Sequence, residues 1–159
     1  MSSINKNQIM GYVLSVFMLL TLLNSAYFFT GVLKLSIGKW LAFNACSISI
    51  IVYLICFIVF LKTKSKILLA IPLLPLYYYG TMGLFIMPWN AANIFAQITH
   101  IIITLNVLWI LYMLLKDRQF ESLGKGLLFG VLVFVPIFAW IQSYTQLHMA
   151  EFMQVLQQM

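Results

Sequence analysis

Four side chains that can form hydrogen bonds follow one face of a strongly apolar segment in the second half of the chain. Asn93, Gln97, His100 and Thr104 are spaced four, three and four residues apart. In a helix this spacing places them within a wedge of roughly 60°. An unpaired polar side chain in apolar surroundings costs several kcal/mol. The stripe therefore predicts either hydrogen bonds to neighbouring helices or a polar site.

His100 is the residue of this stripe with the widest chemistry. A neutral imidazole bonded to Gln97 or Asn24 is the favoured interpretation, since buried polar groups usually have partners. As a site residue it could act as a general base, a proton acceptor or a heme ligand. No cofactor is predicted, although a single heme held by His100 and His148, or a quinone, stays open as an alternative.

The composition identifies the surroundings of this stripe. The chain has 159 residues, of which 64% are hydrophobic and only 8% are charged, and its mean hydropathy is +1.03. Soluble domains carry roughly 25% charged residues. A soluble chain this short could not cover so much apolar surface. We therefore expect an integral membrane protein.

Long stretches without acidic or basic residues define the expected helices. A spanning helix needs about 20 mostly apolar residues, and Pro88–Asn93 reads as a turn that divides the longest stretch. The fold class is thus all-α, a compact bundle of about five transmembrane helices. The expected spans are 9–33, 40–61, 67–88, 92–115 and 126–146. Residues 1–147 form a single helical membrane domain, and 148–159 form a short amphipathic C-terminal segment.

The basic residues predict an orientation, because Lys and Arg accumulate on the cytoplasmic side. With a cytoplasmic N-terminus, seven of the nine lie inside. These are Lys6, Lys62, Lys64, Lys66, Lys116, Arg118 and Lys125, against Lys34 and Lys39 outside. The C-terminus is then extracytoplasmic, and composition favours a bacterial inner membrane. The net charge of +6 needs no nucleic-acid partner; a basic patch for anionic lipid headgroups is a milder interpretation.

This orientation gathers the amides in the extracytoplasmic half of the bundle. The candidate ligand-binding residues are Asn24, Asn44, Asn93, Gln97, His100, Thr104, Tyr77 and Gln142. A purely structural layer of interhelical hydrogen bonds is the commoner meaning of such residues, and an interface with another subunit is a further alternative.

The expected third helix contains unusual residues. Pro72 and Pro75 remove backbone donors and should kink or loosen it. Three successive tyrosines, 77–79, then fall near mid-membrane, and at least one should face the interior. Gly80 and Gly83 allow close approach of a backbone or a flat ligand. This combination suits a pocket for a lipid, a quinone or another flat apolar molecule, although ordinary packing is more common.

Several absences narrow the function. No expected span contains Asp or Glu, and the chain has no H-E-x-x-H, G-x-S-x-G or C-x-x-C motif. We assign no catalytic residue and no metal site. The leading hypothesis is a non-enzymatic accessory or assembly subunit, or a binder of a lipid-like molecule, using the polar layer. An oligomeric small transporter or channel, and a membrane enzyme or heme or quinone protein using His100, are the alternatives. The expected partners are the lipid bilayer and a larger membrane protein or further copies of this chain.

Overall fold

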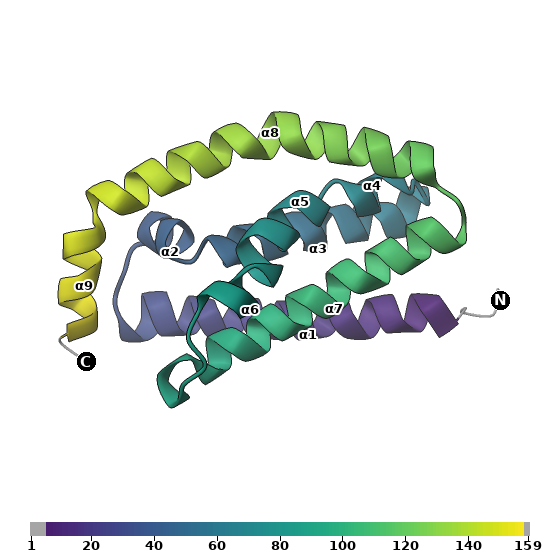
Figure 1. The fold of residues 1–159 in the computed structure, drawn as a ribbon. Helices are drawn as coiled ribbons and strands as arrows, with labels where there is room; N and C mark the ends of the chain where they lie inside the picture. The colour runs from purple at the N-terminus through teal and green to yellow at the C-terminus, as the bar shows by residue number, and fades with distance from the viewer. Residues whose placement is uncertain (1–5, 158–159) are drawn as a thin grey trace.

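The bundle consists of five long helical segments that are apolar enough to cross a membrane. In the computed structural model, which describes residues 6–157, helices alternate with short connections and none of these residues forms a strand. The five segments are Asn7–Val32, Ala45–Thr63, Ile67–Ile86, Ile94–Lys116 and Phe120–Leu147. Figure 1 shows them running back and forth along one long axis. The predicted all-α membrane bundle is therefore confirmed.

The elements follow one another in a simple order. The third span is divided into several short helices. Two segments, marked η1 and η2 below, are π-helical, which means that their turns are wider than those of an α-helix. The elements are α1 (Lys6–Ala26), η1 (Tyr27–Val32), α2 (Ile37–Phe43), α3 (Ala45–Thr63), α4 (Ile67–Ala70), α5 (Leu73–Pro75), η2 (Leu76–Thr81), α6 (Gly83–Ile86), η3 (Ala91–Asn93), α7 (Ile94–Lys116), α8 (Phe120–Leu147) and α9 (Met149–Gln157).

Two predicted spans differ from the observed helices by more than two residues. The span expected over 40–61 is divided at Asn44, whose backbone leaves the helical region (φ −124°, ψ 64°), so α2 and α3 are separate helices. The span expected to begin at residue 126 begins at Phe120. Its first turns include Glu121 and Lys125, which form an i,i+4 ion pair on the helix surface. The predicted span begins only at residue 126 because the sequence prediction places the charges of Glu121 and Lys125 outside the helix.

The third span is interrupted, as its prolines predict. Pro72 and Pro75 cannot donate backbone hydrogen bonds, and both side chains are fully buried. The helix restarts twice and then widens into η2, where the Met82 amide donates to the Tyr77 carbonyl five residues earlier at 3.0 Å. Such wide turns are frequent at functional sites. The interruption changes which residues of this span face the interior.

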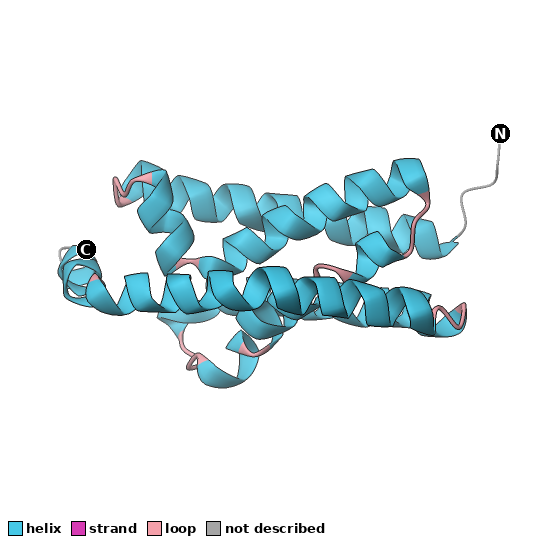
Figure 2. Cartoon of the chain, turned by 90° about the horizontal axis from the view of Figure 1, so that it is seen from above, coloured by secondary structure: helices cyan, strands magenta, loops and turns pink. Residues whose placement is uncertain are grey.

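Close crossings hold the helices together. A Cβ atom added at Gly126 of α8 would lie 2.3 Å from the Cβ of Ala70 in α4, so glycine is needed for this approach. Small residues at helix contacts strengthen packing in membranes, where water drives no association. On the other side, α1 packs against α3 and α7, and the rings of Phe57 and Trp109 meet edge to face at 5.9 Å. Both views show α8 running the length of the bundle (Figure 1 and Figure 2).

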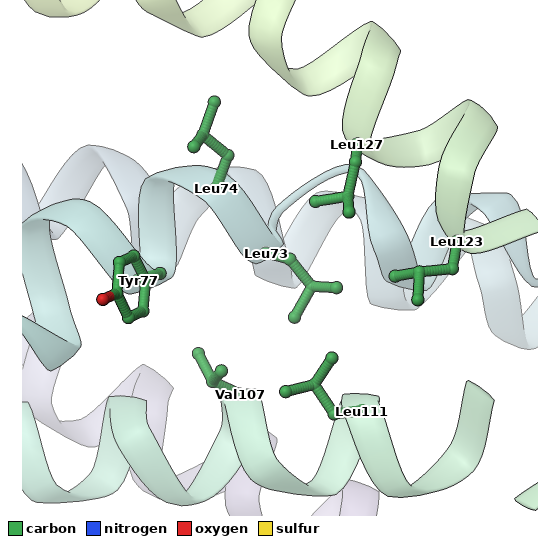
Figure 3. Close-up of a pocket in the computed structure, with 7 residues that line it drawn as sticks. All are labelled: Leu73, Leu74, Tyr77, Val107, Leu111, Leu123 and Leu127. Atoms are coloured by element: carbon green, nitrogen blue, oxygen red, sulfur yellow. The ribbon is translucent and has the colours of Figure 1, made fainter. Parts of the chain in front are cut away.

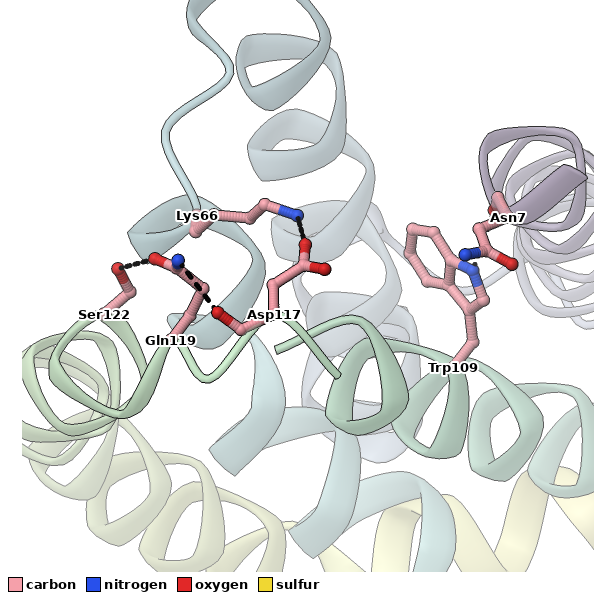
Figure 4. Close-up of polar contacts among 6 residues, drawn as sticks. All are labelled: Asn7, Lys66, Trp109, Asp117, Gln119 and Ser122. Carbon is pink, nitrogen blue, oxygen red and sulfur yellow. Dashed lines mark hydrogen bonds and ion pairs between the residues drawn. The ribbon is translucent and has the colours of Figure 1, made fainter. Parts of the chain in front are cut away.

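Most charged side chains lie at the end of the bundle where α1 begins, here called the basic end. Lys66 pairs with Asp117 at 2.8 Å, which ties the connection before α4 to the one after α7 (Figure 4). This hydrogen bond holds the pKa of the Asp117 carboxyl below its usual value. Nearby, the Trp109 indole donates to the Asn7 carbonyl at 3.0 Å. The polar contacts at this end therefore join α1 to α7 and the connection before α4 to the connection after α7.

The opposite end, here called the terminal end, is closed by α2 and α9. The chain turns at His148, and α9 lies across the end of the bundle (Figure 1). Lys39 of α2 forms an ion pair with Glu151 of α9, and this hydrogen bond lowers the pKa of the Glu151 carboxyl. Thr145 of α8 donates to the Ala42 carbonyl at 3.1 Å. The first contact attaches α9 to α2, and the second attaches α8 to α2.

The α4–α8 crossing gives a direct test of the packing. Gly126→Val should lower the free energy of unfolding by about 1–3 kcal/mol, because the added methyl groups collide with Ala70 and the backbone of α4. The matched control is Gly124→Val, since a Cβ at Gly124 meets no atom within 4 Å. Thermal unfolding in detergent micelles measures both. Equal stability of the two variants would contradict this crossing.

Candidate functional site

A cleft opens at the terminal end between the α2–α3 junction, η2, α6 and the last turns of α8. Its volume is about 690 Å³, within the range of ligand pockets. None of the described residues that line it is Asp, Glu, Lys or Arg. We call it the terminal cleft; its polar lining includes Asn44, Tyr78, Tyr79, His100, Gln142 and Gln146.

His100 forms the inner part of this lining from the second turn of α7. Its side chain is only 5% exposed. The imidazole lies directly on the backbone of α6, because a Cβ at Gly83 would be 2.4 Å from the His100 Cε1 atom. The His100 Nδ1 atom has no hydrogen-bond partner among the described residues. A buried polar atom of this kind usually has a partner. The ring therefore has an unpaired hydrogen-bonding atom, which lies against the backbone of Gly83.

Tyrosines of the interrupted span supply a second polar group. The Tyr79 hydroxyl is buried and has no partner among residues 6–157. Tyr78 accepts a hydrogen bond from the Gln142 amide of α8 at 2.6 Å and stacks on Phe138 with ring centroids 5.0 Å apart. Tyr79 meets the same phenylalanine edge to face at 4.8 Å. In this aromatic cluster the Tyr78 hydroxyl thus forms a hydrogen bond, whereas the Tyr79 hydroxyl has no partner among the described residues.

Asn44 lines the cleft, but its side chain belongs to a hydrogen-bonded cluster that joins α1, α2 and α3. Its amide nitrogen donates to the Ser25 hydroxyl, and its amide oxygen accepts from the Cys46 thiol at 2.6 Å. Ser25 also accepts from the Trp40 indole at 2.9 Å and contacts the Ser47 hydroxyl at 3.3 Å. Because both ends of the Asn44 amide are engaged, its main contribution is to hold these helices together.

Two members of the polar stripe stabilise the turn before α7. The Gln97 amide donates to the Met87 carbonyl at 2.7 Å, and the Asn93 amide donates to the Pro88 carbonyl at 3.1 Å. These carbonyls follow the end of α6 and have no later helical amide to bind. Gln97 is fully buried and its Oε1 atom has no partner among the described residues. Neither residue lines the terminal cleft.

The other three candidate residues lie away from the cleft. Thr104 donates to the His100 carbonyl at 2.8 Å and contacts the Thr81 hydroxyl at 3.3 Å, so it supports the α7–η2 packing. Asn24 is exposed on the outside of α1. Tyr77 lines a second depression, nearer the basic end. Of the eight candidate residues, the structure brings Asn44, His100 and Gln142 together in the cleft.

Tyr78 and Tyr79 line the cleft and Ser25 belongs to the Asn44 cluster, although none of them is among the predicted site residues. Three successive tyrosines point in different directions, but the widened turn after Pro75 rotates Tyr78 and Tyr79, rather than Tyr77, toward the terminal cleft. Ser25, beside Asn24, faces the neighbouring helices. Periodicity alone cannot assign these directions, because it assumes a regular helix.

The two histidines do not converge. The His148 ring stacks on Tyr144 with centroids 4.1 Å apart, and its Nδ1 atom lies 2.9 Å from the Tyr144 carbonyl oxygen. It does not line the terminal cleft. Within residues 6–157, no group of three or more His, Cys, Asp or Glu side chains is placed to hold a metal ion. The arrangement therefore gives no geometric support to a metal site or to a heme between the two histidines.

The chemistry of the cleft is that of neutral hydrogen bonding beside apolar surface. An imidazole nitrogen and a phenol hydroxyl can each donate or accept. Ile86, Met87 and Ile141 line the same space. Comparison with protein-family models, with curated proteins and with solved structures gives no match.

The unpaired Tyr79 hydroxyl gives a prediction about stability. Tyr79→Phe should leave the ligand-free protein as stable as wild type or more stable by about 1 kcal/mol, because it removes a buried hydroxyl that lacks a partner. Tyr53→Phe should lose about 1 kcal/mol, because the Tyr53 hydroxyl lies 2.9 Å from the Ser15 hydroxyl. Thermal unfolding in the same detergent compares them. A larger loss for Tyr79→Phe would mean that its hydroxyl is already engaged.

Proposed function

We propose that this membrane protein binds an uncharged, lipid-like amphipathic molecule in the terminal cleft. The observation that carries the proposal is the buried His100 ring, whose Nδ1 atom has no partner among the described residues. Desolvating such an atom without a hydrogen bond costs about 1–3 kcal/mol. Because this atom lies against Gly83, a ligand in the cleft recovers this energy when the His100 ring turns its nitrogen toward the cleft.

The composition of the cleft supports a neutral ligand group. Its described lining carries no charged side chain that could offset a ligand charge, and an unpaired charge in apolar surroundings is strongly unfavourable. A hydroxyl or carbonyl can bond to His100 or Tyr79 without this cost. The apolar part of the molecule would then contact Ile86, Met87 and Ile141. We assign a binding role and no reaction.

We further propose that the terminal end faces the extracytoplasmic side. The connections and the adjoining helix ends at the basic end carry most of the lysines and the arginine, as expected for the cytoplasmic side. The N-terminus would then be cytoplasmic and the C-terminus extracytoplasmic, in a bacterial inner membrane. The ligand would enter from the outer leaflet or from the space outside it.

The binding proposal is tested by analysing what the purified protein retains. Wild-type protein extracted in mild detergent should carry a small amphipathic molecule that organic extraction and mass spectrometry detect. His100→Ala should lose it, because the free Nδ1 position disappears. His148→Ala is the matched control, since this ring lies outside the cleft lining and bonds within α8. Both variants should first be shown to unfold cooperatively.

A second variant perturbs the same site without removing the histidine. Gly83→Ala should also reduce the retained molecule, because the new Cβ displaces the His100 ring. Gly38→Ala is its control, since a Cβ there meets nothing within 4 Å. Retention of the same molecule by His100→Ala and Gly83→Ala would overturn the proposed site.

The orientation has its own test. With Cys46 and Cys56 replaced by serine, a cysteine at position 38 should react with a membrane-impermeant maleimide added to intact cells. A cysteine at position 65, in the connection at the basic end, should react only after the cells are opened. The reverse pattern would place the terminal cleft on the cytoplasmic side.

A further inference from the structure

A second depression, separate from the terminal cleft, lies between α5, η2, α7 and the start of α8. Its volume is about 230 Å³. Apart from Tyr77, its lining is entirely aliphatic: Leu73, Leu74, Val107, Leu111, Leu123 and Leu127. Figure 3 shows these leucines and Val107 arranged around a common space between the three helical segments. We call it the leucine groove.

One end of this groove lies next to the basic end of the bundle. Leu123 is in the first turn of α8, directly after the connection that contains Arg118. Leu111 lies five residues before Lys116, which is about 7.5 Å along α7. One end of the leucine groove and the positively charged side chains of Lys116 and Arg118 thus lie at the same end of the bundle.

Two basic residues at this end, Lys116 and Arg118, form no ion pair with a described carboxylate. Lys66 and Lys125 are paired with Asp117 and Glu121. Lys116 lies over the Tyr112 ring, 5.4 Å from its centroid, and forms no ion pair with a described residue. The same holds for Arg118, whose backbone has a positive φ of 50°. Lys116, the last residue of α7, and Arg118, in the connection that follows, thus form no ion pair with a described residue at the end of the bundle where the groove ends.

We propose that the leucine groove holds an acyl chain of an anionic phospholipid whose phosphate lies against Lys116 and Arg118. The aliphatic lining matches a hydrocarbon chain, and the charge of the connection complements a phosphate. A volume of about 230 Å³ accommodates part of one chain, so the remaining chain stays in the bilayer. This site is distinct from the terminal cleft and does not depend on the ligand proposed there.

The test compares lipids and groove variants on the full-length protein in detergent micelles. Phosphatidylglycerol and phosphatidylcholine with identical chains are added separately, and native mass spectrometry measures the retained lipid. Glycerol 1-phosphate is added as a headgroup without a chain. Wild-type protein should retain phosphatidylglycerol more strongly than phosphatidylcholine and should not retain glycerol 1-phosphate. Equal retention of the two lipids would overturn the proposal.

Charge variants locate the phosphate. Lys116→Gln and Arg118→Gln should each weaken phosphatidylglycerol retention about fivefold and leave phosphatidylcholine unchanged, because each removes one cation beside the lipid. Lys34→Gln is the matched control, since Lys34 lies at the terminal end and also has a positive φ of 56°. An equal effect of Lys34→Gln would indicate general attraction by the net charge and would overturn the site.

Groove variants locate the acyl chain. Leu127→Trp should fill the groove and weaken retention of both lipids, whereas Leu128→Trp, at a side chain that is 62% exposed on the same helix, should not. Leu111→Phe, from the opposite wall, serves if Leu127→Trp does not fold. Unchanged retention in a folded groove variant would show that the chain binds elsewhere. Loss of the cleft ligand leaves these results unaffected, so the two proposals fail separately.

Discussion

Polar atoms inside an apolar bundle must find partners within the protein, and this constraint organises the terminal end. Where α6 ends, the carbonyls of Met87 and Pro88 have no following helical amides. Gln97 of α7 and Asn93 at the end of η3 supply the missing donors. These bonds fix the start of α7 against α6. One helical turn further on, they bring His100 onto the backbone of Gly83. The site therefore depends on a turn that hydrogen bonds hold closed.

Close approach between helices is the second requirement. Inside a membrane, association depends on packing and on hydrogen bonds rather than on exclusion of water. Glycines allow the contacts: Gly11 faces the Trp109 ring, Gly80 faces Ile103, and Gly126 faces Ala70. The interrupted third span is central to this packing, because its short segments contact α3, α7 and α8. Its prolines also widen the backbone where the tyrosines turn toward the cleft.

The two depressions differ in chemistry because different side chains line them. The terminal cleft combines amide, imidazole and phenol groups without a charged residue among its described lining. The leucine groove is almost wholly aliphatic and ends beside cations. A neutral polar group suits the first, and a hydrocarbon chain below a phosphate suits the second. Aromatic rings of Tyr78, Tyr79 and Phe138, together with the buried Phe134, pack on one another where η2 meets α8.

The sequence by itself determined the membrane class, the number of spans and the helical face that carries the polar stripe. These properties follow from local composition and periodicity, which a spanning helix must satisfy whatever its neighbours. Only the tertiary structure decided which stripe residues are used for packing and which remains unpaired. Asn93 and Gln97 bond to the turn after α6, and Thr104 bonds to Thr81 of η2. The Nδ1 atom of His100 and the Oε1 atom of Gln97 have no partner among the described residues. Hydrogen-bond partners depend on the relative position of whole helices, and the interruption at Pro72 and Pro75 changes those positions in a way that a regular helical period does not encode.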